Sequence, residues 1–399
     1  MATSKAGPDR AFLVGVKLSG ASANSGFEDS LEELRALAGS GGFDTGGEMY
    51  FKRDRPDAAC FIGSGQAERL TEAAKADGAQ CIVFDRELSA VQERNLSQIV
   101  DLPIVDRSEL ILRIFASRAR SNEGKLQVEL ARLEHLAARL VRGWSHLERQ
   151  RGGIGVRGGP GEKQVELDRR MITTKVKKLR GELEKITRQR KTRRRARARG
   201  ATFNVAIVGY TNAGKSTLFN RLTGAESYAA DQLFATLDTL TREIPANAWP
   251  RLMPQVVISD TVGFVRDLPH QLVEAFHATL EETIQADLLL HVVDTSALDR
   301  EAQIAQVNKV LNAIGAANIP QLIVLNKIDK IGADDTRCGS ISKLFVSAQT
   351  GLGMESLKQE IMRVALENAS FEPISANHAA YPSVTPPDEQ TVESDLFLE

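Results

Sequence analysis

Long apolar runs are missing from this 399-residue chain, and its opening Met-Ala-Thr-Ser-Lys lacks the apolar centre of a leader peptide. No run approaches the roughly 18 residues that a membrane-spanning helix needs. Cysteine is rare, and Cys60, Cys81 and Cys338 lack the spacing of a zinc site. These absences argue against a membrane span or a disulfide scaffold and predict a reduced protein of the cytoplasm. Cys81, inside an apolar run, is expected to be a buried thiol.

Aromatic residues are also scarce, at 5% of the chain, although 42% apolar residues suffice for two or three buried cores. The net charge of −1 hides a strong segregation. Residues 151–200 carry 18 Lys and Arg against 5 Asp and Glu, which leaves 33 basic and 47 acidic residues elsewhere. Within them, residues 188–199 hold eight positive charges and no acidic residue. This run is either a solvated face or, as we expect, a contact for RNA through charge and shape.

A phosphate-binding loop is the most informative motif. Residues 209–217 fit G-x-x-x-x-G-K-[ST], follow a predicted buried strand at 203–208 and lead into a predicted helix. In such a loop the backbone N–H groups and the helix N-terminus cradle phosphates. Lys215 would reach the terminal phosphates and Ser216 would ligate Mg²⁺. The nine loop residues are Gly209, Tyr210, Thr211, Asn212, Ala213, Gly214, Lys215, Ser216 and Thr217.

Two later motifs predict that the nucleotide carries guanine. An N-K-x-D pattern over residues 326–329 follows an apolar run. The Asp329 carboxylate can accept hydrogen bonds from both N1–H and the 2-amino group of guanine, a donor pair that adenine lacks. This motif argues against a metabolic P-loop kinase. The predicted base-binding residues are Asn326, Lys327, Asp329, Ser347 and Ala348.

Two segments between these motifs predict the metal and γ-phosphate contacts. Asp260, which opens D-x-x-G, would hold Mg²⁺ directly or through water, and Gly263 would donate its N–H to the γ-phosphate. Thr236 is the best candidate for a second hydroxyl on Mg²⁺, with Thr239 and Thr241 as rivals. The predicted catalytic residues are Lys215, Thr236 and Gly263, and the predicted metal ligands are Ser216, Thr236 and Asp260. The remaining nucleotide-binding candidates are Phe234, Ala235, Thr261 and Val262.

Two positions bear on how the reaction is catalysed. Many GTPases have a water-orienting Gln after D-x-x-G, but here Phe264 stands there and cannot hydrogen-bond. We therefore expect weak basal hydrolysis, with the water positioned by another group or a partner. Packing of Phe264 beside Val262 and Val265 is a compatible alternative. Asn212 either holds K⁺ beside the phosphates or only hydrogen-bonds the loop, so K⁺ is a second candidate ion.

Four regions are expected along the chain. An α/β domain spans 1–106, a helical hairpin with a glycine-rich tip and a basic end spans 107–199, an α/β P-loop G domain spans 200–370, and an acidic, disordered tail spans 371–399. We also expect the chain to be a monomer when free.

The first domain is predicted to contain a mainly parallel sheet, with strands at 11–16, 58–62, 80–84 and 102–105. Gly63-Ser64-Gly65 could cup a phosphate or form only a tight turn.

Two long helices are predicted for the hairpin. Apolar residues are spaced 4-3-4-3 over 126–147 and again over 172–186, as in a coiled-coil seam. The glycine-rich run 152–161 between them is expected not to be helical.

From residue 11 to 368 the chain resembles the HflX family of ribosome-associated GTPases. The likeness rests on stretches at 61–65, 152–155, 161–162, 168–170, 209–217, 234–238 and 260–264. It implies binding to the large ribosomal subunit and its RNA, with the N-terminal part near the peptidyl-transferase region. It also implies GTP-dependent splitting of stalled or stress-inactivated ribosomes, and some members are credited with ATP use or RNA unwinding. The chain departs at Gln66, where the family often has Lys, and in its acidic tail. An RNA-remodelling or ribosome-biogenesis factor regulated by GTP is the alternative.

Overall fold

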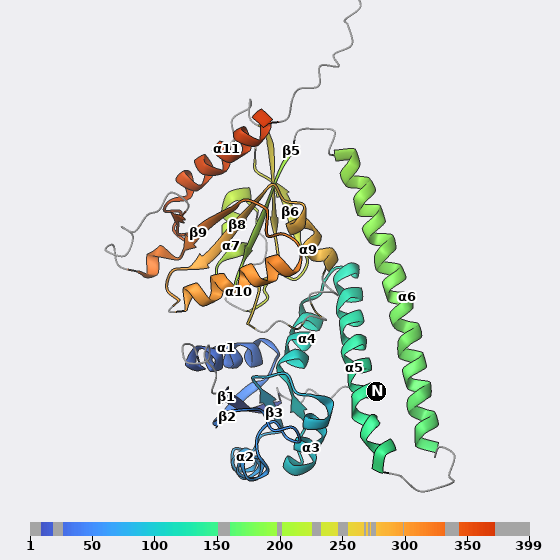
Figure 1. Ribbon diagram of the computed structural model, residues 1–399. Helices are drawn as coiled ribbons and strands as arrows, with labels where there is room; N and C mark the ends of the chain where they lie inside the picture. Colours follow the sequence, from blue (N-terminus) through green and yellow to red (C-terminus); the bar gives the residue numbers. More distant parts are fainter. Residues whose placement is uncertain are drawn as a thin grey trace, which may run out of the picture.

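The computed structural model describes residues 9–18, 27–150, 160–197, 202–225, 233–245, 254–266, 269, 272, 277–297, 299–331 and 343–371. Two α/β parts lie one above the other in Figure 1, and a long pair of helices connects them, with α6 running alongside both. The predicted acidic tail from 372 onward and the side chains of the basic run from 190 onward lie outside the described residues.

The N-terminal part is a four-stranded sheet in the order β2-β1-β3-β4, and every pair in it is parallel. Helical crossovers between successive strands produce this arrangement, because parallel neighbours cannot be joined by a tight turn. The predicted parallel sheet is therefore confirmed. Its elements are β1 (Arg10–Leu18), α1 (Phe27–Ser40), β2 (Asp44–Arg53), α2 (Ser64–Ala76), β3 (Cys81–Phe84), α3 (Ala90–Val100) and β4 (Ile104–Val105).

One predicted strand of this sheet is wrong. Residues 58–62 form a turn closed by a single bridge between Asp57 and Phe61, and the strand beside β1 is β2 instead. Only Phe51 of β2 is buried, because β2 lies at the sheet edge, and its apolar signal is correspondingly weak. Cys60, Phe61 and Ile62 of this stretch are buried in the core beside the adjoining helices without joining the sheet, whereas Ala58 and Ala59 are exposed.

The turn at Gly63 begins α2 and is capped from within the helix. The Gly63 N–H donates to the Gln66 side-chain oxygen at 3.2 Å. A phosphate bound at this turn would need the Gly63 N–H as a donor, but that group is already bonded to Gln66. The contact therefore favours a tight turn over a phosphate site.

The described residues of the region 107–199 form three helices where two were expected: α4 (Arg107–Arg118), α5 (Asn122–Gln150) and α6 (Pro160–Arg197). The extended backbone of Ala119 ends α4, whose buried residues join the core of the N-terminal sheet. Helix α6 begins at Pro160, so the glycine-rich run is helical at its last two residues, contrary to expectation. Proline is tolerated there because the first helical position needs no N–H. Residues 151–159 of the tip lie outside the described residues.

Helices α5 and α6 run antiparallel (Figure 1) and pack along the predicted apolar spacing. Leu130 and Leu179, one from each helix, are each only 5% exposed. Two ion pairs join the helices, Lys175–Glu129 at 2.5 Å and Arg180–Glu134 at 2.6 Å. Exposed pairs of this kind contribute at most about 1 kcal/mol each, so the apolar seam dominates the pairing.

The C-terminal part is a six-stranded sheet in the order β10-β9-β8-β5-β7-β6, parallel except for the β6–β7 pair. Central strand β5 is buried on both faces, with Val205 and Ile207 in one core and Ala206 and Val208 in the other. Its elements are β5 (Thr202–Gly209), α7 (Lys215–Thr223), β6 (Leu240–Glu243), β7 (Gln255–Asp260), α9 (His277–Ile284), β8 (Leu288–Asp294), α10 (Arg300–Ala313), β9 (Gln321–Asn326), η2 (Ile328–Lys330), β10 (Lys343–Phe345) and α11 (Met354–Phe371).

Two further expectations concern membranes and thiols. Across the described ranges, none of the helices is long and apolar enough to cross a membrane. Cys81 is a free thiol, 5% exposed, and burial raises its pKa to about 11, as expected of a buried structural cysteine.

Candidate nucleotide-binding site

The phosphate loop leaves the carboxyl end of β5 and runs into α7, the strand–loop–helix order that the motif requires. The Lys215 side chain turns back across the loop, and its Nζ donates to the Tyr210 carbonyl at 2.7 Å. Burial lowers the pKa of Lys215 to about 8, although the nearby Asp260 carboxylate opposes this shift. A buried ammonium beside converging backbone donors is a ready partner for phosphate oxygens.

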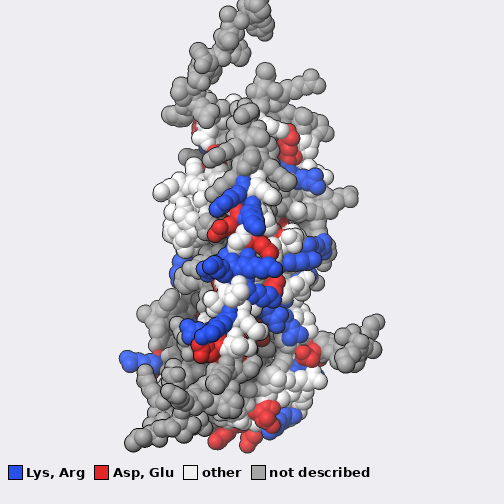
Figure 2. All heavy atoms as spheres, turned by 90° about the vertical axis from the view of Figure 1, so that its right-hand side faces the viewer, with Lys and Arg blue, Asp and Glu red and all other residues white. Residues whose placement is uncertain are grey.

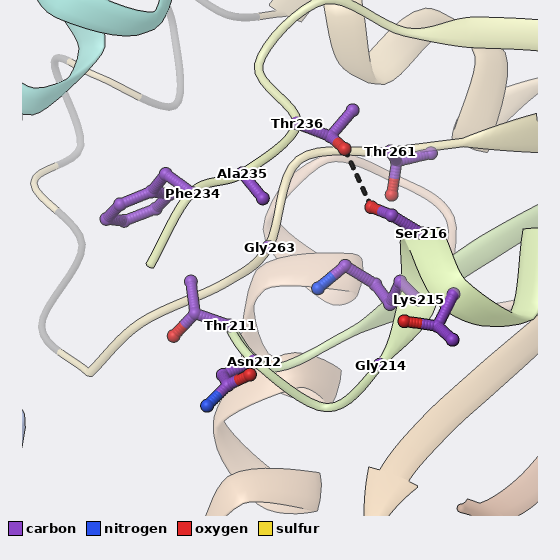
Figure 3. A pocket seen from close by; sticks show the side chains of 11 residues that line it. Thr211, Asn212, Gly214, Lys215, Ser216, Phe234, Ala235, Thr236, Thr261 and Gly263 are labelled. Atoms are coloured by element: carbon purple, nitrogen blue, oxygen red, sulfur yellow. Dashed lines mark hydrogen bonds between the residues drawn. The ribbon is translucent and has the colours of Figure 1, made fainter. Parts of the chain in front are cut away.

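A hollow lies between the phosphate loop and two crossing segments (Figure 3). It is lined by Thr211, Asn212 and residues 214–217 of the loop, by residues 234–236, and by Thr261 and Gly263. The structure therefore brings together predicted site residues from three separate stretches. Gly209, Tyr210, Ala213, Asp260 and Val262 are not among the residues that line it.

Three side-chain oxygens converge at one end of the hollow. Asp260 Oδ2 accepts hydrogen bonds from Ser216 Oγ and Thr236 Oγ1, each at 2.8 Å, and the two hydroxyls are 2.7 Å apart (Figure 3). Asp260 is fully buried, and its Oδ1 has no hydrogen-bond partner among the described residues. Burial raises the pKa of Asp260, against the effect of Ser216 and Lys215.

This set of oxygens fits Mg²⁺. The cation prefers one or two carboxylates, hydroxyl or water oxygens and substrate phosphates to a cage made by protein alone. In keeping with that preference, the described part of the chain holds no group of three His, Cys, Asp or Glu residues suited to a metal. The rival Thr241 lies instead in β6, with its hydroxyl 3.1 Å from Ser259 Oγ.

The segment after β7 is joined to the phosphate loop through its backbone. The Thr211 N–H donates to the Phe264 carbonyl at 2.8 Å, and the Phe264 N–H donates to the Gly209 carbonyl at 3.1 Å. A Cβ added at Gly263 would lie 2.8 Å from Lys215 Nζ and from Thr211 Cγ2, and 3.0 Å from the backbone Cα of Thr211, so a side chain at 263 would crowd the phosphate loop. Gly263 therefore lies against the phosphate loop and lines the hollow together with Lys215.

Phe264 is buried, as the core-packing alternative proposed, but its neighbours differ from those expected. It is 2% exposed and packs with Ala206 and Val208 in the G-domain core. Val262 and Val265 instead join the apolar cluster shared with the N-terminal part. The Phe264 ring is thus sequestered from the hollow.

The base-binding motifs meet behind the phosphate loop. Asn326 is buried, its amide donates to the Ala213 carbonyl at 2.9 Å, and its side-chain oxygen accepts the Ala348 N–H at 2.9 Å. Ser347 Oγ donates to Asp329 Oδ1 at 2.5 Å, while Asp329 itself is exposed. Asn326 therefore ties three loops together, and Ser347 orients a carboxylate that is open to a ligand.

Asp294 supports this site and was missed from the sequence. It ends β8 opposite Asn326 and forms an ion pair with Lys327 at 2.7 Å. Burial alone would raise the pKa of Asp294, but hydrogen bonds from Lys327 and Ser296 hold it below its ordinary value. The only available signal was an acidic residue at the end of an apolar run.

Tyr210 contributes its backbone to the loop, but its side chain points to the N-terminal part. Its hydroxyl donates to Glu33 of α1 and accepts the Arg266 N–H at 2.8 Å. Arg107 of α4 is 2% exposed and bonds Glu33, Asp85 and the Arg266 carbonyl. The Tyr210–Glu33 pair is separated by 177 residues, so no local pattern could reveal it.

Three family models match the chain. They are described as GTP-binding GTPase N-terminal over residues 28–116, GTP-binding GTPase Middle Region over 118–197 and 50S ribosome-binding GTPase over 204–327. The matches follow one another along the chain and include the helical pair as well as the phosphate loop.

Curated relatives extend this similarity. GTPase HflX of Escherichia coli is 46% identical over 374 residues, covering 92% of this chain and 84% of the relative. GTPase HflX of Caldanaerobacter subterraneus is 43% identical, covering 84% of this chain and 77% of the relative. A crystal structure of a GTP-binding protein from Sulfolobus solfataricus in complex with GDP aligns at 24% identity with a TM-score of 0.45, over 90% of this chain and 99% of that one.

Proposed function

Because the chain belongs to the HflX family of GTPases and hydrolyses GTP, we propose that it acts on the large ribosomal subunit in the cytoplasm and there splits or rescues stalled or stress-inactivated ribosomes. The family model that matches the G domain is described as a 50S ribosome-binding GTPase, which supports the choice of partner. RNA remodelling, or ribosome biogenesis regulated by GTP, is the competing function.

The outer face of α6 is the observation that carries this proposal. Figure 2 shows Lys and Arg side chains distributed along the middle of the face that α6 presents. On α6 the side chains of Arg170, Lys178 and Arg188 are 77%, 76% and 81% exposed, and each forms an exposed ion pair with a glutamate four residues away on the same helix. A helix that presents exposed positive charge over much of its length suits an RNA backbone, since each neutralised phosphate releases counterions.

In the proposed reaction Lys215 binds the terminal phosphates, and Ser216, Thr236 and Asp260 hold Mg²⁺. The ion supplies charge stabilisation for the transferred phosphoryl group when it is bound. The Gly263 N–H donates to the γ-phosphate, and Asp329 and Asn326 select guanine. Phe264 lies in the core and cannot orient water. Basal turnover is therefore expected to be weak, with stimulation by the ribosome.

Large subunits should raise GTP turnover by on the order of a hundredfold or more, since partners that complete a GTPase site act on this scale. Substituting Arg193, Arg194 and Arg195 together by Ala should weaken this stimulation but leave basal hydrolysis unchanged. The salt dependence of binding should also fall, by up to about 0.9 in log–log slope per lost phosphate contact.

The assay is GTP turnover with and without purified large subunits, paired with sedimentation in GDP or a non-hydrolysable GTP analogue. A triple Ala variant at Arg300, Lys309 and Arg363, exposed on α10 and α11, is the charge-matched control. Absence of stimulation in the wild type would refute ribosome activation. Tighter binding to naked RNA than to subunits at physiological salt would favour RNA remodelling.

Asn212 provides a separate test of the proposed K⁺ site. It lines the hollow, is exposed and has a φ of 60°. A cation fixed there would stabilise charge that develops between the phosphates. We expect faster hydrolysis in KCl than in NaCl, and loss of this difference in Asn212→Ala. Equal rates in the two salts, both alone and with ribosomes, would rule out the ion.

A further inference from the structure

The segment that carries Thr236 is anchored to the helical part of the molecule on both sides. Two residues before it, the Phe234 ring meets Phe115 of α4 edge-on, with centroids 4.7 Å apart and planes at 86°. Two residues after it, Asp238 binds the start of α5. Phe234 and Leu237 also join the apolar cluster that α1, α4 and α5 share. Thr236 thus lies between two residues, Phe234 and Asp238, that both contact helices outside the G domain.

Asp238 binds the two residues that precede α5 from outside that helix. Its Oδ2 accepts the backbone N–H groups of Arg120 at 3.1 Å and Ser121 at 2.8 Å, and its Oδ1 accepts the Ser121 hydroxyl at 2.5 Å. Ser121 Oγ in turn accepts the Gly124 N–H at 2.8 Å. Ser121 Oγ thus pairs an N–H group in the first turn of α5, and the Asp238 carboxylate holds Ser121 at the positive end of the helix dipole.

Gly124 makes room for this contact. A Cβ built on Gly124 would lie 2.3 Å from Asp238 Oδ1 and 3.2 Å from Ser121 Oγ. The first distance is far below any allowed contact, so a side chain at 124 forces the carboxylate away from α5. Glycine is otherwise a poor choice within a helix, where it costs about 1 kcal/mol relative to Ala. The close approach of Asp238 explains its presence.

We propose that Asp238 is a positioning residue for GTP hydrolysis that acts through Thr236. Its hydrogen bonds to the start of α5 hold the Thr236 hydroxyl beside Ser216 and Asp260. The inference rests on the proposed role of Thr236 as a Mg²⁺ ligand. Under this proposal, nucleotide binding and the position of α5 are coupled in both directions. A bound nucleotide that holds Thr236 in place also holds the contact between Asp238 and the start of α5. The hairpin that presents the basic face is thereby connected to the metal site by a short stretch of chain.

Gly124→Ala tests the inference without altering the G domain. It should lower the single-turnover rate of GTP hydrolysis about tenfold, the scale of a lost hydrogen bond to a charged group, and raise the Mg²⁺ concentration needed for half-maximal rate. Affinity for GDP without Mg²⁺ should stay within about twofold. Gly181→Ala is the matched control, because Gly181 lies within α6 and an added Cβ there meets nothing within 4 Å. Asp238→Ala, which adds no bulk, should reproduce the effect.

Thr236→Ala separates this inference from the proposed function. If the anchor acts through Thr236, Gly124→Ala should have no further effect in the Thr236→Ala background. An equal additional loss there, or a Gly124→Ala variant indistinguishable from Gly181→Ala, would overturn the anchor while leaving Thr236 as a ligand. Unchanged Mg²⁺ dependence in Thr236→Ala would remove both the ligand role and the inference built on it.

Discussion

Lys215→Ala is expected to lower GTP turnover at least about a hundredfold, since removing one preorganised charge from a closed site costs on this order or more. Lys215 is 6% exposed, and its ammonium donates to the Tyr210 carbonyl of its own loop at 2.7 Å. Among the described residues that line the hollow, none other carries a cation that could replace it. Ser216→Ala should have a comparable effect, because it removes a hydroxyl that meets both Asp260 and Thr236.

Ser216→Thr is the control for these variants, since it keeps the hydroxyl. Turnover with Mg²⁺ is measured at saturating GTP, and thermal unfolding verifies that each variant folds. Loss of activity in Ser216→Ala with substantial retention in Ser216→Thr identifies the oxygen as the functional group. Wild-type turnover in Lys215→Ala would remove this site from the mechanism.

Asp329→Asn should change the base that the protein prefers from guanine to xanthine. Replacing the carboxylate removes two charge-assisted hydrogen bonds to guanine, each worth about 1.5–3 kcal/mol. The affinity of the variant for GTP should therefore fall by about a hundredfold or more. Ser347 Oγ already donates to Asp329 Oδ1, and it can hold an amide oxygen in the same place. The Asn amide N–H₂ would then face the base and could donate to the 2-oxo group of xanthine.

Binding of GTP and xanthosine triphosphate by both proteins, measured by competition with a fluorescent nucleotide, tests this expectation. Asp329→Ala is the control, because it lacks both donor and acceptor and should bind both nucleotides weakly. Ser347→Ala should weaken GTP binding less, since it loosens the carboxylate without removing it. If Asp329→Asn retains wild-type GTP affinity, Asp329 does not recognise the base.

Local patterns were enough to predict most of the G domain. The spacing of the phosphate loop, the apolar runs that precede each motif and the order of the motifs are all short-range features. The phosphate loop, D-x-x-G and N-K-x-D each lie at the carboxyl end of a strand of the sheet (β5, β7 and β9), and the carboxyl ends of these parallel strands meet at one edge. The edge strand β2 was not predicted, because it lacks an apolar run. With one buried residue, it carries almost none of the apolar signal by which strands are recognised.

By itself, the sequence determined the guanine-nucleotide chemistry, the antiparallel helical pair and the segregation of positive charge, because each depends on residue types at fixed spacing. Only the tertiary structure decided which hydroxyl meets Asp260, where Phe264 packs and how the domains touch. The Tyr210–Glu33 bond and the contact of Asp238 with the start of α5 join residues more than a hundred positions apart. Such contacts depend on the docking of whole domains, which brings together side chains that no periodicity or motif relates.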